Sequence, residues 1–262
     1  MISVTDLLAA GSGSLVGFVL GLIGGGGSIL AVPLLVYVVG VASPHVAIGT
    51  SAIAVALSAF VNLLPHARSG HVKWRCAMLF AAAGIVGAVI GSSFGKEFDG
   101  QRLLGLFGVL MIVVGIVTLI KRNRTGDPDV MLTWSSAPRL APLILLYGVA
   151  VGTLAGFFGI GGGFLVVPGL MAATQMPIIS AVGSSLVPVT AFGFTTATNY
   201  ALSGLIDWRL ASLFVAGGFI GGLFGARLAI ALTGRKELLQ MVFAVIIIAV
   251  GLYVVARSVP IW

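Results

Sequence analysis

Residues 21–35 read GLIGGGGSILAVPLL, and residues 156–170 read GFFGIGGGFLVVPGL. Both stretches join an apolar segment to a glycine cluster and then to a short apolar run that contains a proline. Each glycine in a helix interior costs about 1 kcal/mol relative to alanine, and proline removes a backbone hydrogen-bond donor. The two stretches therefore predict two broken helices at equivalent points of a repeated structure.

The composition of the chain identifies lipid as the solvent for most of its surface. Of its 262 residues, 59% are hydrophobic and 8% are charged, with a mean hydropathy of +1.18, whereas a soluble domain carries about 25% charged residues. We predict an all-α polytopic integral membrane protein. The net charge of +7 then belongs to cytoplasmic loops and anionic headgroups rather than to a nucleic-acid site. The N-terminus has no basic region before its first apolar run, so we expect that run to be retained.

The duplication continues beyond the glycine clusters at an offset of 134 residues. The matches pair Gly49-Thr50-Ser51 with Gly183-Ser184-Ser185, Ser69-Gly70 with Ser203-Gly204, Trp74-Arg75 with Trp208-Arg209, and Gly84, Gly87 and Gly91 with Gly218, Gly221 and Gly225. We predict a first transmembrane repeat over 1–121, a cytoplasmic linker over 122–139 and a second repeat over 140–262. Transporters are often built in this way, with the site at the repeat interface.

Ten apolar segments lie at roughly 7–23, 28–42, 46–64, 76–95, 103–120, 140–158, 164–173, 179–200, 210–232 and 238–256. Most approach the ~20 residues that a helix needs to span the hydrocarbon core, but the second and seventh are short. If each short segment continues the helix before it, the chain has eight spans. If each crosses alone, the chain has ten spans and the repeats are inverted. Lys and Arg place 66–75 and 121–139 in the cytoplasm in both cases, but the C-terminus lies inside with eight spans and outside with ten.

Several motifs together resemble a known family. The duplicated glycine-rich segment is followed by V-P-x-L and then by G-T/S-S, and residues 66–75 read HARSGHVKWR. In this order they resemble the sulfite exporter TauE/SafE family of permeases over essentially the whole chain. The resemblance implies about eight transmembrane helices, two repeats of about four with a broken first segment, and transport of sulfite, sulfonates or related anions. Asn199-Tyr200 stand where the first repeat has Pro65-His66, so the repeats need not contribute identical ligands.

The broken helices predict a binding site for a small anion. A break exposes a helix N-terminus, whose free N–H groups and positive dipole end suit an anion, and irregular backbone at membrane depth needs cover from protein or a water-filled cavity. The predicted site comprises Gly24, Gly26, Gly27 and Ser28 with Gly159, Gly161, Gly162 and Gly163. The alternative is close helix packing at small residues, which we favour for the glycine pairs 17/21, 87/91 and 221/225.

Polar residues in the following helices complete the predicted site. They are Thr50, Ser51, Ser184 and Ser185 near helix starts, Asn62 and Asn199 further along, and His66 at a helix end. A polar group in a membrane span usually faces inward and is often functional. The alternatives are capping or backbone hydrogen bonding for the hydroxyls, and interfacial anchoring for the basic stretch that begins at His66.

The positions of the acidic residues limit how transport can be coupled to a proton gradient. All seven fall in predicted loops or at helix ends, namely Asp6, Glu97, Asp99, Asp127, Asp129, Asp207 and Glu237, so a proton relay of intramembrane carboxylates is missing. No nucleophile–base pair or metal-ligand cluster lies within the spans, and we expect no enzyme activity, cofactor, metal or nucleic-acid partner. We expect a permease in a bacterial inner membrane that exports a small anion, as a monomer or an oligomer. An anion channel and an uptake permease for a sulfur-containing or carboxylate anion are the alternatives.

Overall fold

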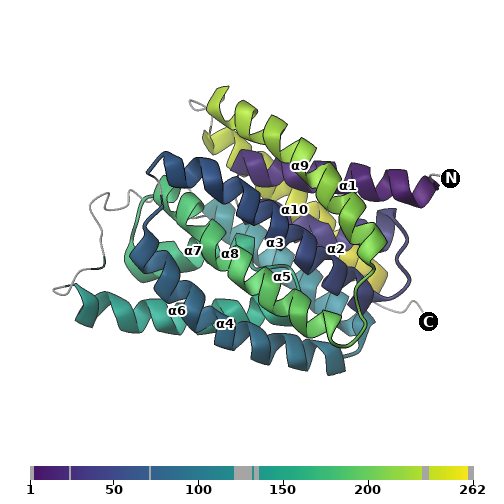
Figure 1. The fold of residues 1–262 in the computed structure, drawn as a ribbon, viewed down its shortest axis with the longest axis horizontal. Helices are drawn as coiled ribbons and strands as arrows, with labels where there is room; N and C mark the ends of the chain where they lie inside the picture. The colour runs from purple at the N-terminus through teal and green to yellow at the C-terminus, as the bar shows by residue number, and fades with distance from the viewer. Residues whose placement is uncertain are drawn as a thin grey trace.

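The computed structural model describes residues 3–23, 25–70, 72–120, 132, 136–231 and 236–258, and all regular secondary structure in this part of the chain is helical. Its elements are α1 (Val4–Ile23), the 3-10 helix η1 (Gly25–Leu30), α2 (Ala31–Pro33), the π-helix η2 (Leu34–Val38), α3 (Pro44–Arg68), α4 (Trp74–Glu97), α5 (Gly100–Ile120), α6 (Ala137–Phe158), α7 (Gly163–Thr174), α8 (Ile178–Ala201), α9 (Trp208–Ala231) and α10 (Lys236–Ser258) (Figure 1). Within the described ranges, seven helices are long and apolar enough to cross a membrane. The predicted class, a multi-pass helical membrane protein, is confirmed.

The predicted linker 122–139 lies outside the described residues except for Leu132 and residues 136–139. Helix α6 begins at Ala137, just inside the predicted end of that linker. The helix therefore starts a few residues earlier than its apolar pattern indicates.

Both predicted helix breaks are present. Helix α7 has 12 residues and so rises about 18 Å, well short of the ~30 Å hydrocarbon core. Before it, Gly159, Gly161 and Gly162 have φ angles of +64°, +62° and +71°. This left-handed conformation is readily adopted only by glycine, and it ends α6 at Phe158. In the first half, the helical path from Gly25 to Val38 changes from 3-10 to α to π geometry.

Glycines on the long helices allow very close packing. The most extensive helix pairs are α1 with α9 and α4 with α6. A Cβ atom at Gly17 would overlap the backbone of Gly218, and one at Gly221 would overlap the backbone of Ser14. Added Cβ atoms at Gly87 and Gly91 would likewise meet the α6 backbone. These contacts agree with the packing interpretation for the small-residue pairs.

The first half of the chain turns back between α1 and α3. Gly13 and Gly17 of α1 face Phe214 and Gly218 of α9 in the same order, so these helices are parallel. Helix α3 is also parallel to α9, because Ser58 and Asn62 lie beside Gly218 and Gly222. Helices α1 and α3 therefore run in the same direction, and the short segment between them returns across the bundle.

The second half turns back in the same way. Gly152 and Gly156 of α6 face Gly84 and Ala88 of α4 in the same order. Helix α8 is also parallel to α4, because hydrogen bonds join the two helices near both their N-terminal and their C-terminal ends. Both halves thus differ from the eight-span alternative, in which each break lies within a single helix. In the second half, the left-handed glycines reverse the chain instead of letting it continue in one direction. In the first half, the reversal follows the 3-10 helix that begins at Gly25.

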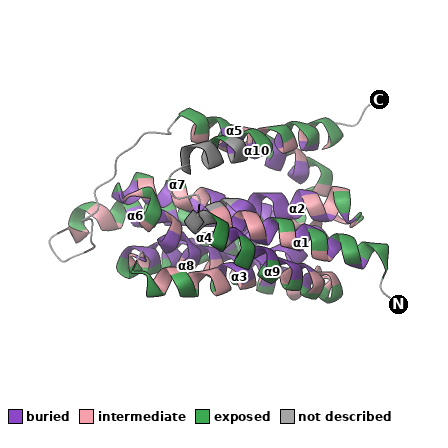
Figure 2. Ribbon diagram, turned by 90° about the horizontal axis from the view of Figure 1, so that it is seen from above, coloured by how far each residue is buried: buried purple, intermediate pink, exposed green. Residues whose placement is uncertain are grey.

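Helices α3 and α8 cross at the centre of the bundle and are antiparallel. Gly193 of α8 lies against Ala56 and Ala52, whereas Tyr200, further along α8, lies against Gly49. Helices α5 and α10 pair with each other and lie together along one side of the other helices (Figure 2). The helix breaks are covered by other helices, because η1 contacts α1, α7 and α8, and α7 contacts α6 and α8.

Replacing Gly17 with leucine should strongly destabilise the protein. The new Cβ atom would overlap the Gly218 backbone, so α1 and α9 must separate, and overpacking of this kind costs about 1–3 kcal/mol or more. Thermal unfolding in detergent measures the effect. Gly11→Leu is the matched control on the same helix, because nothing lies within 4 Å of an added Cβ there. Equal losses of stability in the two variants would contradict the packing argument.

Candidate functional site

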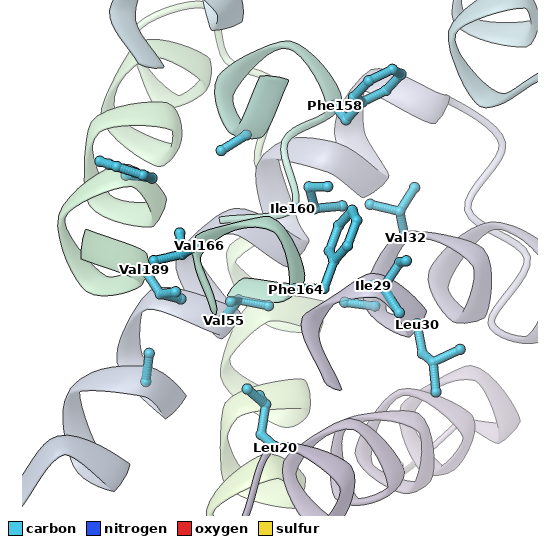
Figure 3. Packing of buried hydrophobic residues seen from close by; sticks show 14 of the residues in the cluster. Leu20, Ile29, Leu30, Val32, Val55, Phe158, Ile160, Phe164, Val166 and Val189 are labelled. Atoms are coloured by element: carbon cyan, nitrogen blue, oxygen red, sulfur yellow. The ribbon is translucent and has the colours of Figure 1, made fainter. Parts of the chain in front are cut away.

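The two helix breaks meet at the core of the bundle. The contacts between η1 and α7 bring Ile29 and Val32 of the first break toward Ile160 and Phe164 of the second (Figure 3). All four side chains are buried. The point where the two helix breaks meet is therefore lined by these four apolar side chains.

Gly161 lies between the crossing helices α3 and α8, level with their midpoints. An added Cβ there would be 3.0 Å from Cγ1 of Val55 and 3.7 Å from Cγ1 of Val189. These valines lie near the midpoints of α3 and α8 (Figure 3). Gly163 begins α7 two residues later, and it is buried. The N-terminal end of α7, with its positive dipole end, thus starts inside the protein near the centre of the spans.

The first break is packed on α1. A Cβ at Gly27 would be 2.5 Å from the backbone nitrogen of Leu20, and Ser28 is completely buried. Gly26 belongs to η1, and Gly24 lies outside the described residues. The described glycines of the two predicted clusters thus pack on different helices: Gly27 lies against α1, Gly159 against α3, and Gly161 between α3 and α8.

The four predicted hydroxyl groups all form hydrogen bonds with backbone groups. Oγ1 of Thr50 accepts a hydrogen bond from the backbone N–H of Asp207 at 3.0 Å, and Oγ of Ser184 accepts one from Lys73 at 2.8 Å. Ser51 donates to the carbonyls of Ile48 at 2.9 Å and Gly159 at 3.3 Å. Ser185 donates to the carbonyl of Val182 at 2.7 Å. Thr50 and Ser184 thus do not cap their own helices, and each instead accepts from the residue that precedes another helix, α9 or α4.

Asn62 and His66 lie on α3, away from the glycine turns. The amide nitrogen of Asn62 donates to the Ser58 carbonyl at 2.9 Å, and the side chain sits beside Gly222 of α9. His66 is half-buried in the last turn of α3, next to exposed residues of the α3–α4 connection. Neither residue is brought to the meeting point of the two breaks.

Asn199 is part of a polar network that the sequence pattern did not predict. Lys96 donates to the side-chain oxygen of Asn199 at 2.8 Å and to its carbonyl at 3.2 Å. The amide nitrogen of Asn199 donates to Oγ of Ser92 at 2.6 Å. A single lysine at the end of a span is typical of interfacial anchoring, so Lys96 gave no distinct signal. The serines one turn before it were the only local sign.

Two further polar groups on α8 are buried without a hydrogen-bond partner among the described residues. They are the hydroxyl oxygens of Thr196 and Tyr200, which lie one turn apart. Buried polar groups are nearly always paired, so such groups often mark a place where a ligand or water binds. With Asn199, they place three polar side chains in the last two turns of α8.

A buried helix start at the centre of a polytopic bundle is an arrangement found in membrane transporters, where broken helices present their ends to the substrate. The comparisons with known proteins agree with this class. The family model of the sulfite exporter TauE/SafE matches residues 9–254, and the chain belongs to this family.

Several relatives of the chain are described as probable membrane transporter proteins. A probable membrane transporter protein of Xylella fastidiosa (strain 9a5c) is 52% identical over 96% of this chain and 95% of its own length. The probable membrane transporter protein YunE of Bacillus subtilis (strain 168) is 28% identical over 91% of this chain and 93% of its own length. The probable membrane transporter protein MJ0441 of Methanocaldococcus jannaschii is 28% identical over 68% of each chain. No solved structure is a significant match.

Proposed function

We propose that this membrane transporter exports a small anion, sulfite or an organosulfonate, through the interface of its two helix breaks. The observation that carries the proposal is the position of the Gly159–Gly163 turn, which starts α7 at half depth beside Val55 and Val189. Backbone N–H groups and the positive dipole end suit an oxyanion there. The family description as a sulfite exporter favours sulfite as the substrate.

We infer that the two halves of the chain are inverted repeats, over 1–121 and 140–262. The helix pairings are unchanged when the halves are exchanged, because α1 pairs with α9 as α6 pairs with α4. The hydrogen bonds from Asp207 to Thr50 and from Lys73 to Ser184 are also equivalent, since both residues of each pair are related by the same offset of 134. Inverted repeats provide two equivalent conformations that open to opposite sides of the membrane.

The inverted arrangement implies ten crossings, counting each short broken segment as one. One side then holds Arg68, Lys73, Arg75, Lys121, Arg122, Arg124, Arg139, Arg227, Arg235 and Lys236, and the other holds Lys96, Arg102, Arg209 and Arg257. The richer side is cytoplasmic by the positive-inside rule. Both termini then lie outside the cytoplasm, and we propose a bacterial inner membrane as the location. Lipid is the solvent for the exposed apolar faces.

The described carboxylates favour export without ion coupling. Asp6 is buried at the start of α1, but it is paired with Arg209 at 2.7 Å. Asp99 accepts a hydrogen bond from the backbone of Arg102, and Asp207 from that of Leu210. These acids lie at helix ends and not along a transport path. Because the membrane potential is negative inside, it favours export of each negative charge by about 2.3 kcal/mol per 100 mV.

Anion flux in liposomes should therefore follow an imposed electrical potential. We expect purified protein to move sulfite under a potassium-diffusion potential at equal pH and without sodium, at a rate that rises with the potential. The rate should saturate with sulfite concentration, which separates a permease from an anion channel. Flux that stays at background under the potential and begins only when a pH gradient is added would overturn uncoupled export. His66 would then be the leading proton carrier.

A further inference from the structure

We propose that Lys96, Asn199 and Ser203 form a second oxyanion subsite, at the outer ends of α4 and α8. This subsite rests on the proposed function. In that function, the exported anion binds here last before it is released. The residues come from two helices and the turn after α8, and hydrogen bonds hold them together. The ligand class is a small oxyanion, such as sulfite or sulfate.

The network holds the Lys96 ammonium in place with neutral partners. Its three hydrogen bonds go to the carbonyl and the side-chain oxygen of Asn199 and to Oγ of Ser203, at 3.2, 2.8 and 2.9 Å. Asn199 is itself fixed, because its amide nitrogen donates to Ser92 and Ser93 at 2.6 and 3.1 Å. The position of the charge is therefore set before any anion arrives.

The charge of Lys96 has no carboxylate partner among the described residues. Among the described residues, the ion pair is the one between Arg209 and Asp6. Glu97 follows Lys96 in the chain, but its side chain is exposed and forms no ion pair with Lys96. The Ser203 hydroxyl that now accepts from this ammonium is neutral, whereas an oxyanion in its place adds the Coulomb attraction of a full negative charge. An oxyanion can therefore replace the Ser203 hydroxyl, which lies in an exposed turn, while Asn199 keeps the ammonium in position.

The other half of the chain shows that the fold does not require this network. At the offset of 134, Ile230 stands for Lys96, Pro65 for Asn199 and Ala226 for Ser92. Arg227, in the place of Ser93, is exposed. The α3–α9 contact nevertheless forms, although it is less extensive than the α4–α8 contact. The network is thus an addition at one end of the bundle, which argues against a purely structural role.

The subsite continues toward the centre of the bundle along α8. Thr196 lies three residues before Asn199, and its buried hydroxyl has no partner among the described residues. Val189, beside the glycine turn, lies two turns further in on the same helix. An anion that leaves the turn toward the outer side would meet Thr196 and then Lys96.

The test is the thermal shift that sulfite, and separately sulfate, produces in the purified protein at constant ionic strength. We expect wild-type protein to be stabilised and Lys96→Met to need an anion concentration about tenfold higher or more, as expected for the loss of a charged hydrogen bond. Lys96→Arg should keep most of the response. Arg102→Met is the matched control, because it removes an exposed cation from the same end of the bundle and should respond like wild type.

Several outcomes would overturn the subsite. One is a thermal shift in Lys96→Met that equals that of wild-type protein. Another is a loss of the thermal shift in Arg102→Met as large as that in Lys96→Met, which would show that the anion responds only to general surface charge. A lipid headgroup offers the same oxyanion chemistry, so the titration is repeated with phosphatidylglycerol. A Lys96-dependent shift with the lipid but not with sulfite or sulfate would assign the network to lipid binding. A Lys96-dependent anion shift in protein that moves no sulfite in liposomes would support the subsite and overturn the proposed export.

Discussion

Replacing Gly161 with leucine should abolish anion flux while leaving membrane insertion intact. Gly161 has a φ of +62°, a conformation that costs a residue with a side chain about 1–2 kcal/mol. Its added side chain would also press on Val55 and Val189, where α3 and α8 cross, and would occupy the space at the start of α7. Sulfite flux per inserted molecule in liposomes is the measurement.

Gly40→Leu is the matched control for the conformational cost of placing a residue with a side chain at a positive φ angle. Gly40 has a φ of +83°, but nothing lies within 4 Å of an added Cβ. We expect this variant to lose some stability and keep its flux. If Gly161→Leu transports at the wild-type rate at equal expression, the interface of the helix breaks is not the anion path. If Gly40→Leu loses flux equally, backbone strain alone explains the loss.

If the chain crosses the membrane ten times, cysteines in intact cells should be either fully labelled or fully shielded, depending on the side of the membrane on which they lie. In a Cys76→Ser background, Leu202→Cys should react with an impermeant thiol reagent, because the exposed α8–α9 turn lies outside when the repeats are inverted. Ser69→Cys, in the α3–α4 connection, should be shielded until the membrane is permeabilised. Asn123→Cys should also be shielded, as the charge distribution predicts.

The same experiment separates the two topologies. With eight crossings, the α8–α9 connection would be cytoplasmic, and Leu202→Cys would be shielded like Ser69→Cys. That result would refute the inverted repeats. Labelling of Ser69→Cys from outside would instead reverse the assignment of the cytoplasmic side, on which both topologies agree.

The sequence predicts where the helices break but not the direction of the chain after each break. Glycine clusters at 24–27 and 159–163 interrupt any helix, so the breaks follow from local propensity. In the second half, the chain reverses through the left-handed φ angles of Gly159, Gly161 and Gly162, which glycine permits but does not impose. In the first half, it reverses without a left-handed φ angle among the described glycines of the cluster. The count of basic residues was nearly as one-sided for eight spans as for ten, so the positive-inside rule was not decisive.

The sequence predicted which polar residues belong to the candidate site, but it did not predict their hydrogen-bond partners. Thr50 and Ser184 lie near helix starts, but each accepts from a residue in the other half of the chain. Long-range pairing of this sort leaves no mark on local sequence. Lys96 was missed for the same reason: Asn199 was predicted as a site residue, but it is 103 residues from Lys96 along the chain, so the sequence did not connect the two.

The pairing of α1 with α9 has a consequence for biosynthesis. Helix α9 begins at Trp208, so at about 5–20 residues per second the ribosome needs roughly 10–40 s to supply the partner of α1. During that interval the glycine face of α1 is exposed to lipid or to the insertion machinery. The fold is therefore completed only near the end of translation. A nascent chain stalled before α9 is the natural substrate for membrane chaperones and quality-control proteases.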